Sequence, residues 1–126
     1  MKRVIIAIVL ILFAFSITIA ENLYIRNSYN DLVKKINLAE EYINSENYKM
    51  AKLTSYEIEK KWEKQEEVFA LFISQDHLQK ISLSITNLKE FSNKEYKGFF
   101  LSQTGQVKFL LNHIKKDENF NLTGIF

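Results

Sequence analysis

Residues 4–20 read VIIAIVLILFAFSITIA, a run of seventeen residues without a single charge. A helix rises about 1.5 Å per residue, so this run reaches the lower limit for crossing a bilayer core of roughly 30 Å. Residues 23–25 (LYI) extend the apolar surface, and Tyr24 would lie at headgroup depth, where an amphipathic ring is favourable. The sequence therefore predicts an N-terminal membrane anchor over residues 1–25.

A cleavable secretory signal has the same layout, and the sequence leaves it open as the alternative. Residues 18–20 (TIA) before Glu21 form an acceptable cleavage site, with Ala at the last position. Two features favour an uncleaved anchor: the apolar run exceeds the roughly 7–15 residues of a signal core, and a helical pattern continues beyond it without Pro or Gly. Either interpretation exports the remainder of the chain.

Positive charges near the span bear on its orientation. Lys2 and Arg3 precede it, and positive charge flanking a first span resists translocation. We therefore expect a single-pass protein of the cell membrane with a cytoplasmic N-terminus and an extracytoplasmic body, or a secreted body after cleavage. The opposite orientation stays open, because Lys34 and Lys35 also lie close to the span.

The body that follows, residues 26–126, is long enough for one small domain. The chain has 17 Lys and Arg, of which two precede the span, against 15 Asp and Glu, so the body is formally neutral. A neutral body argues against nucleic-acid binding, which depends on neutralising several phosphates. The chain has no Pro and three Gly, which favours long uninterrupted elements, and it has no Cys for disulfides.

Apolar residues in the body recur every three or four positions, which is the pattern of amphipathic helices. Four such stripes follow one another. The first comprises Ile25, Tyr29, Leu32, Ile36, Ala39 and Ile43. The second comprises Tyr48, Ala51, Ser55, Ile58, Trp62, Gln65, Phe69 and Phe72. The third comprises Leu78, Ile81, Ile85, Leu88 and Phe91. The fourth comprises Tyr96, Phe100, Gln103, Val107, Leu110 and Ile114.

Short polar segments separate the stripes. Residues 44–47 (NSEN) suit a helix end followed by a new cap, Asp76 can cap the third helix, and residues 92–93 (SN) follow that helix. We expect the last helix to stop at the charged residues 115–118, whose two Lys residues favour a carboxyl end.

Gly98 and Gly105 are seven residues apart and fall opposite the last stripe. Each weakens a helix by up to about 1 kcal/mol relative to Ala. Two explanations stay open: a neighbour packed close against that face, or a local break near residues 102–105.

Short breaks between amphipathic helices make antiparallel neighbours. The predicted fold is therefore all-α, with an N-terminal transmembrane helix (1–25) running into an antiparallel bundle of about four helices (26–126). We interpret Gln65 and Gln103 as register or bundle-end residues. Trp62, the only Trp, is interpreted as a core anchor rather than a ligand platform.

No set of residues predicts catalysis, a cofactor site or a metal site. His113 and Asp117 are spaced i, i+4, but two ligands do not make a metal site and no Cys completes one. His77 follows the Asp76 cap at a helix boundary. No phosphate loop, dinucleotide fingerprint or nucleophile elbow is present. We therefore expect no catalytic, cofactor-binding or metal residues, and no enzyme.

Charged residues on the second helix have spacings that stabilise an exposed face. Glu57 with Lys61 has the i, i+4 order, and Lys64 with Glu67 adds an i, i+3 pair. We interpret this face as solvated rather than as a carboxylate site.

The whole pattern resembles a known family. A basic start, one span, the segment EKKWEKQEEVFALFI (59–73), His77 and the terminal residues GIF (124–126) are similar to DUF4363, a family of small single-span bacterial membrane proteins. That family is defined by a domain of unknown function. The resemblance implies a membrane-anchored helical protein, encoded near multi-span membrane proteins. It implies no activity, substrate or catalytic residue.

These observations favour a non-enzymatic, membrane-tethered module that binds another membrane or envelope protein, a multi-span protein being one kind of partner. A homo-oligomer is compatible with the same pattern. The alternative is an extracytoplasmic small-ligand sensor that acts through a partner, since three residues precede the span. Residues 122–126 (LTGIF), apolar and outside the predicted helices, would dock on the bundle itself or on a partner.

Overall fold

The computed structural model describes the backbone of residues 1–71 and 73–125, and the side chains of residues 1–71 and 73–116. It contains four helices, α1 (Lys2–Asn44), α2 (Tyr48–Phe69), α3 (Gln75–Leu88) and α4 (Lys97–Ile125). The described part of the chain contains no β-strand. The prediction of an all-α fold with four helices is confirmed.

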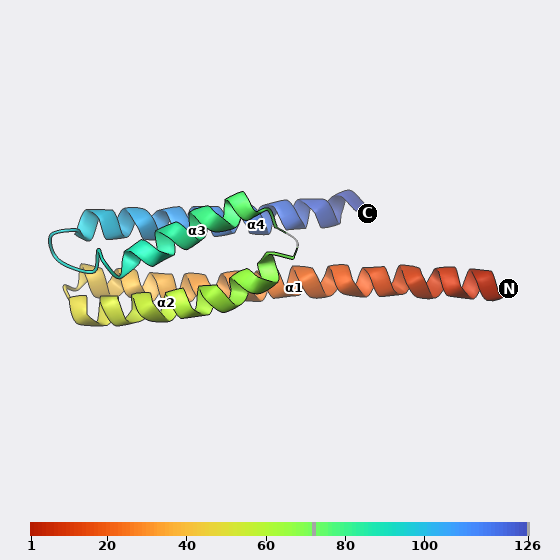
Figure 1. Cartoon of the computed structure of the whole chain (residues 1–126), viewed down its shortest axis with the longest axis horizontal. Coiled ribbons are helices and arrows are strands. Elements are labelled where there is room, and N and C mark those ends of the chain that lie inside the picture. Colours follow the sequence, from red (N-terminus) through yellow and green to blue (C-terminus); the bar gives the residue numbers. More distant parts are fainter. Residues whose placement is uncertain (72, 126) are drawn as a thin grey trace.

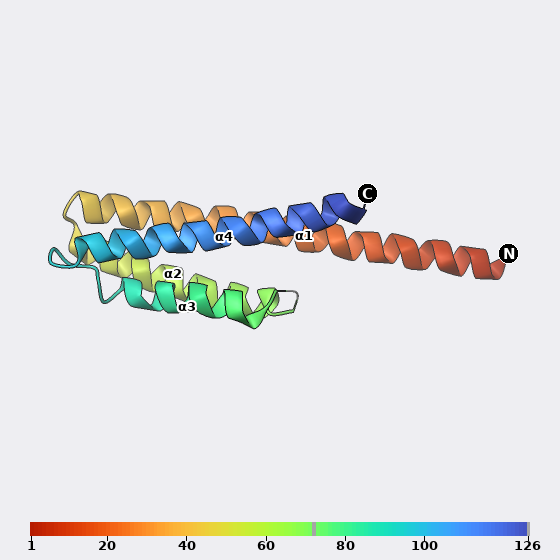
Figure 2. The same cartoon turned by 90° about the horizontal axis from the view of Figure 1, so that it is seen from above.

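The helices form an antiparallel bundle in which α1 and α3 each pack against both α2 and α4 (Figures 1 and 2). Residues 45–47 and the α3–α4 connection, residues 89–96, lie together at one end, which we call the distal end. The α2–α3 connection lies at the opposite, proximal end. There α1 projects well beyond the other three helices (Figure 1).

Only the second half of α1 belongs to the bundle. No residue from 1 to 24 is buried, and Ile25 is the first that is. From there the predicted stripe holds, because Leu32, Ile36, Ala39 and Ile43 are also buried. Tyr29 is half-buried.

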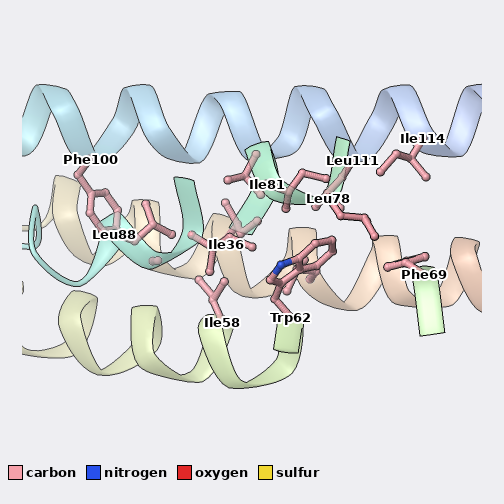
Figure 3. Close-up of a cluster of buried hydrophobic side chains, with 14 of the residues drawn as sticks. Ile36, Ile58, Trp62, Phe69, Leu78, Ile81, Leu88, Phe100, Leu111 and Ile114 are labelled. Atoms are coloured by element: carbon pink, nitrogen blue, oxygen red, sulfur yellow. The ribbon is translucent and has the colours of Figure 1, made fainter. Parts of the chain in front are cut away.

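Trp62 lies inside the core that the four helices share (Figure 3). Its side chain is 2% exposed, and its ring centroid is 5.7 Å from that of Phe69. The indole Nε1–H donates a hydrogen bond to Ser82 Oγ on α3 at 2.8 Å. A large buried ring whose N–H is satisfied stabilises a core strongly. The interpretation of Trp62 as a core anchor is confirmed.

The second and third stripes agree with the structure. On α2 the predicted residues from Ala51 to Phe69 are buried, Tyr48 is half-buried, and Phe72 lies outside the described residues. On α3 the four predicted residues are buried, and Phe91 packs against the core after the helix has ended. Gln65 is buried near the proximal end, and its Oε1 has no hydrogen-bond partner within the described residues.

The fourth stripe was predicted one residue out of place at two positions. Thr104 and Leu111 are buried where Gln103 and Leu110 were expected, and both of the latter are half-buried. Tyr96, expected at the start of this stripe, precedes α4 and is 39% exposed. The hydroxyl of Thr104 makes its burial possible, because it donates to Glu40 Oε2 of α1 at 2.7 Å.

Residues 44–47 end α1 and start α2 as expected. The backbone N–H of Asn47 donates to Tyr42 O at 2.8 Å and that of Glu46 to Ile43 O at 3.2 Å, which is the Schellman pattern. Glu46 accordingly adopts a positive φ of 63°. Asn47 Oδ1 then caps α2 by accepting from the N–H of Met50 at 3.3 Å.

Asp76 does not cap α3, contrary to the prediction. Ser74 occupies the N-cap position with extended backbone, and Asp76 lies within the first turn. A carboxylate in a first turn still interacts favourably with the helix dipole. Asp76 therefore indicates where α3 begins, but it lies in the first turn and not at the predicted N-cap position.

The charged residues 115–118 do not stop α4, which continues to Ile125. Lys and Glu are good helix formers, and neither Pro nor Gly occurs between Gly105 and Gly124. The prediction that residues 122–126 lie outside any helix is consequently wrong for residues 122–125. Phe126 lies outside the described residues.

Among the side chains that the structure describes, ion pairs join different helices or adjoining segments rather than residues of one helix. Glu57 Oε2 pairs with Lys35 Nζ at 3.0 Å, and Lys61 Nζ with Asp31 Oδ2 at 3.7 Å, both between α2 and α1. This corrects the predicted pairing of Glu57 with Lys61. Exposed pairs of this kind contribute about 0–1 kcal/mol each, so they favour the antiparallel register more than they add stability.

Two further ion pairs connect the remaining helices. Lys89 Nζ lies 3.2 Å from Glu59 Oε2, which joins the segment after α3 to α2. Lys108 Nζ lies 2.6 Å from Glu40 Oε1, which joins α4 to α1. The same Lys108 ammonium donates to Asn37 Oδ1 at 3.2 Å.

Candidate interaction surfaces

The projecting half of α1 is a long, continuous apolar surface. The aliphatic and aromatic side chains of residues 4–13 are between 51% and 64% exposed, apart from the small Ala7. Within the described residues, α1 is the one helix that is long and apolar enough to cross a membrane. Water-soluble proteins rarely expose continuous apolar patches, and such a surface usually marks an interaction site.

Tyr24 stands at the junction between the projecting half and the bundle. Its ring meets that of Phe69, the last residue of α2, edge-on with centroids 5.7 Å apart. The side chain is half-buried. The predicted change from an apolar segment to an amphipathic one thus falls where the other helices begin to cover α1.

A second apolar surface, the distal aromatic cluster, consists of Phe91, Tyr96 and Phe99. The ring centroids lie 5.7 Å apart for Phe91 with Tyr96, 5.7 Å for Phe91 with Phe99, and 6.1 Å for Tyr96 with Phe99. Phe91 packs on the core, whereas Tyr96 is 39% and Phe99 59% exposed. Lys94, Glu95 and Lys97 lie between the rings in sequence, and Lys94 and Glu95 are exposed.

The distal aromatic cluster was missed in the sequence because Tyr96 and Phe91 were assigned to core stripes. Asn93 explains their arrangement, since its Oδ1 accepts from the N–H of Tyr96 at 2.9 Å and forms a turn before α4. The density of rings in FSNKEYKGFF (91–100) was the signal that was available.

Gly98 and Gly105 lie on the outer face of α4. A Cβ added at either position would meet nothing within 4 Å. The explanation by a close neighbour within the chain is therefore wrong, and so is the local break, because α4 is continuous from Lys97. Phe109 is 69% exposed on the same helix.

The two histidines come together although they are 36 positions apart. The rings of His77 on α3 and His113 on α4 have centroids 6.2 Å apart, and Phe109 stacks on His113 at 6.5 Å. The side chain of Asp117, considered with His113 in the sequence, lies outside the described residues. Among the side chains of residues 1–71 and 73–116, no group of three or more His, Asp and Glu is placed to hold a metal.

A shallow groove of about 600 Å³ runs along the outside of α1 and reaches Lys61 of α2. Its lining is mostly charged, with Asp31, Lys34, Lys35, Glu41 and Lys61 beside Asn37 and Leu38. Sites for small molecules are usually enclosed and mostly apolar. This groove is open and carries both signs of charge.

Four antiparallel helices, one of them prolonged by an exposed apolar segment of bilayer length, define a helical-bundle protein with a candidate membrane helix. A family model described as "Domain of unknown function (DUF4363)" matches residues 19–125. The chain therefore belongs to the DUF4363 family, in agreement with the resemblance seen in the sequence. No curated protein and no solved structure matches it.

Proposed function

We propose that this protein is a non-enzymatic, membrane-tethered module whose bundle binds another membrane or envelope protein. In this proposal α1 crosses the cell membrane with Lys2 and Arg3 in the cytoplasm, and the bundle lies outside. The partner binds at the distal aromatic cluster.

The observation that carries the proposal is the continuity of α1. The helix runs from Lys2 to Asn44 without a break, so it is about 65 Å long. Its projecting half is exposed and needs an apolar environment, whereas its second half is covered by α2 and α4. One rigid element therefore joins the anchor to the bundle.

The distal aromatic cluster supports a protein partner. Exposed aromatic residues are enriched at the centres of protein interfaces and often supply most of the binding energy. The cluster lies at the opposite end of the bundle from the projecting half (Figures 1 and 2). About twenty residues of α1 separate Ile25 from the distal end, so the rings would stand roughly 30 Å from the membrane surface.

The test is crosslinking in native membranes with the full-length protein. We expect a specific membrane or envelope protein to be recovered with the wild type and to be lost from Phe99→Glu. Leu53→Glu is the matched control, because Leu53 is 52% exposed on α2, outside the cluster. Recovery of contacts between copies of this chain alone would contradict the proposal, as would equal recovery with both variants.

The alternative, a sensor for a small solute, has the charged groove on α1 as its supporting feature. A saturable rise in melting temperature of the detergent-solubilised protein with a solute would favour it. Lys61→Ala should then weaken that response, since Lys61 lines the groove from α2.

A further inference from the structure

The end of α4 leaves the bundle next to α1. At the proximal end α4 extends past the α2–α3 connection, and α1 is the helix that continues beside it in both views (Figures 1 and 2). His113 lies beside His77, which is in the first turn of α3. Because the two helices are antiparallel, the residues of α4 beyond about 116 lie past the start of α3.

Contacts between α1 and α4 show which residues of α1 lie beside the C-terminal end of α4. Thr104 Oγ1 donates to Glu40 Oε2, and Lys115 Nζ lies 4.5 Å from the centre of the Tyr29 ring. These two contacts are separated by eleven residues on each helix, so the helices run antiparallel in step. The same register, continued for ten residues beyond Lys115, places Ile125 level with Ile19, at the outer end of the apolar run.

The charged residues of α4 end close to the level at which α3 begins and ceases to cover α4. Residues 115–118 read KKDE, and residues 119–125 read NFNLTGI, without a charge. Water-facing helix surfaces usually carry charged residues. An uncharged helix end with Phe, Leu and Ile suits the interface of a membrane instead, where aromatic rings are also enriched.

We propose that residues 119–125 of α4 form a second membrane contact, in the headgroup and upper acyl region of the bilayer that α1 crosses. This inference rests on the proposed membrane anchor. In the register described, Phe120 is level with Tyr24 and Ile125 with Ile19. The helix end thus lies roughly 7 Å deeper than the level of Tyr24, which is within the depth of interfacial helices. The bundle is then held at the bilayer by two adjacent helices.

Single-cysteine labelling of the full-length protein tests this contact, because the chain contains no Cys. Ile125→Cys is labelled with an environment-sensitive fluorophore and reconstituted in phosphatidylcholine–phosphatidylglycerol vesicles, with and without lipids that carry a nitroxide quencher on the acyl chain. Ile17→Cys reports the anchor, since Ile17 is 52% exposed on the projecting half. Gln106→Cys, on the exposed face of α4 inside the bundle, is the control in water.

We expect the probe at residue 125 to emit at shorter wavelength than the probe at residue 106 and to be quenched by the nitroxide lipid, though less than the probe at residue 17. Quenching at residue 17 without quenching at residue 125 would overturn this inference and leave the anchor intact. A blue-shifted but unquenched probe at residue 125 would also overturn it, because protein would then cover that end. Absence of quenching at residue 17 would overturn the anchor itself. Thr123→Cys repeats the measurement if labelling at residue 125 disturbs the helix.

Discussion

The two halves of α1 are one helix with opposite surfaces. Residues 4–17 are apolar on nearly every side and exposed, whereas residues 25–43 are apolar along one stripe, of which all but the half-buried Tyr29 are buried. The backbone is the same in both halves. The difference teaches that side-chain pattern alone distinguishes the two halves. A single apolar stripe is covered by two neighbouring helices, α2 and α4, whereas a helix that is apolar all round has the composition of a candidate membrane span.

The largest expected effect comes from shortening a side chain in the buried half. Ile36 is 0% exposed, so Ile36→Ala should lower the free energy of unfolding by about 2–5 kcal/mol. Ile11→Ala is the matched control, because Ile11 is 56% exposed and should change it by less than about 0.5 kcal/mol. Chemical unfolding of the full chain in mild detergent measures both. Equal losses would mean that the two halves do not differ as described.

A charge in the projecting half should have the converse effect. Leu10→Arg should disfavour membrane insertion by about 2.5–3.5 kcal/mol, because a guanidinium at the centre of a span must be desolvated. Leu10 is 62% exposed, so the stability of the bundle should stay the same. Flotation with vesicles measures the first quantity and thermal unfolding the second. A bundle that unfolds with Leu10→Arg would show that the projecting half packs on protein.

A smaller effect is expected from the polar contact between α1 and α4. Glu40→Ala should cost about 1–2 kcal/mol, since it removes the carboxylate partner of Lys108 and deprives the buried Thr104 hydroxyl of its acceptor on α1. Glu57→Ala removes the more exposed pair with Lys35 and should cost less than about 0.5 kcal/mol. Denaturant midpoints compare the two. An equal loss of unfolding free energy in both variants would show that the hydrogen bond from Thr104 to Glu40 does not stabilise the bundle.

The smallest effect concerns the outer face of α4. Gly105→Ala should raise the free energy of unfolding by up to about 1 kcal/mol, because the position is helical and the added Cβ meets open space. Gly98→Ala should raise the free energy of unfolding by less, because Gly98 lies in the first turn of α4, where helices fray. Melting temperatures measured in the same detergent test this order. A loss of stability at position 105 would mean that a neighbour does occupy that face.

The sequence predicted most of the fold because its patterns are long and regular. Three stripes were assigned correctly, and the turn at residues 44–47 was recognised from its polar residues. The prediction of the fourth stripe was wrong at positions where periodicity does not distinguish two adjacent residues. Leu110 and Leu111 are adjacent and equally apolar, and Gln103 and Thr104 are adjacent and both polar. The choice of Thr104 depends on Glu40, 64 positions away, which periodicity does not contain.

The candidate surfaces were harder to predict than the core. The exposure of Tyr96 and Phe99 depends on where α4 begins, and that is decided by a turn at Asn93 rather than by a stripe. The pairing of His77 with His113 depends on the register of α3 against α4. The end of α4 was misplaced because a charged segment was taken as a helix stop, although its residues favour helix.

An unbroken α1 acts as a lever. Transmembrane helices tilt on average by about 20°. If α1 crosses a membrane as proposed, such a tilt over the roughly 30 Å between Ile25 and Asn44 would displace the distal rings sideways by about 10 Å. Because α1 has no break that could bend, a change in the tilt of its first half would change the position of the distal end of the bundle. A change in bilayer thickness is one cause of such a change in tilt.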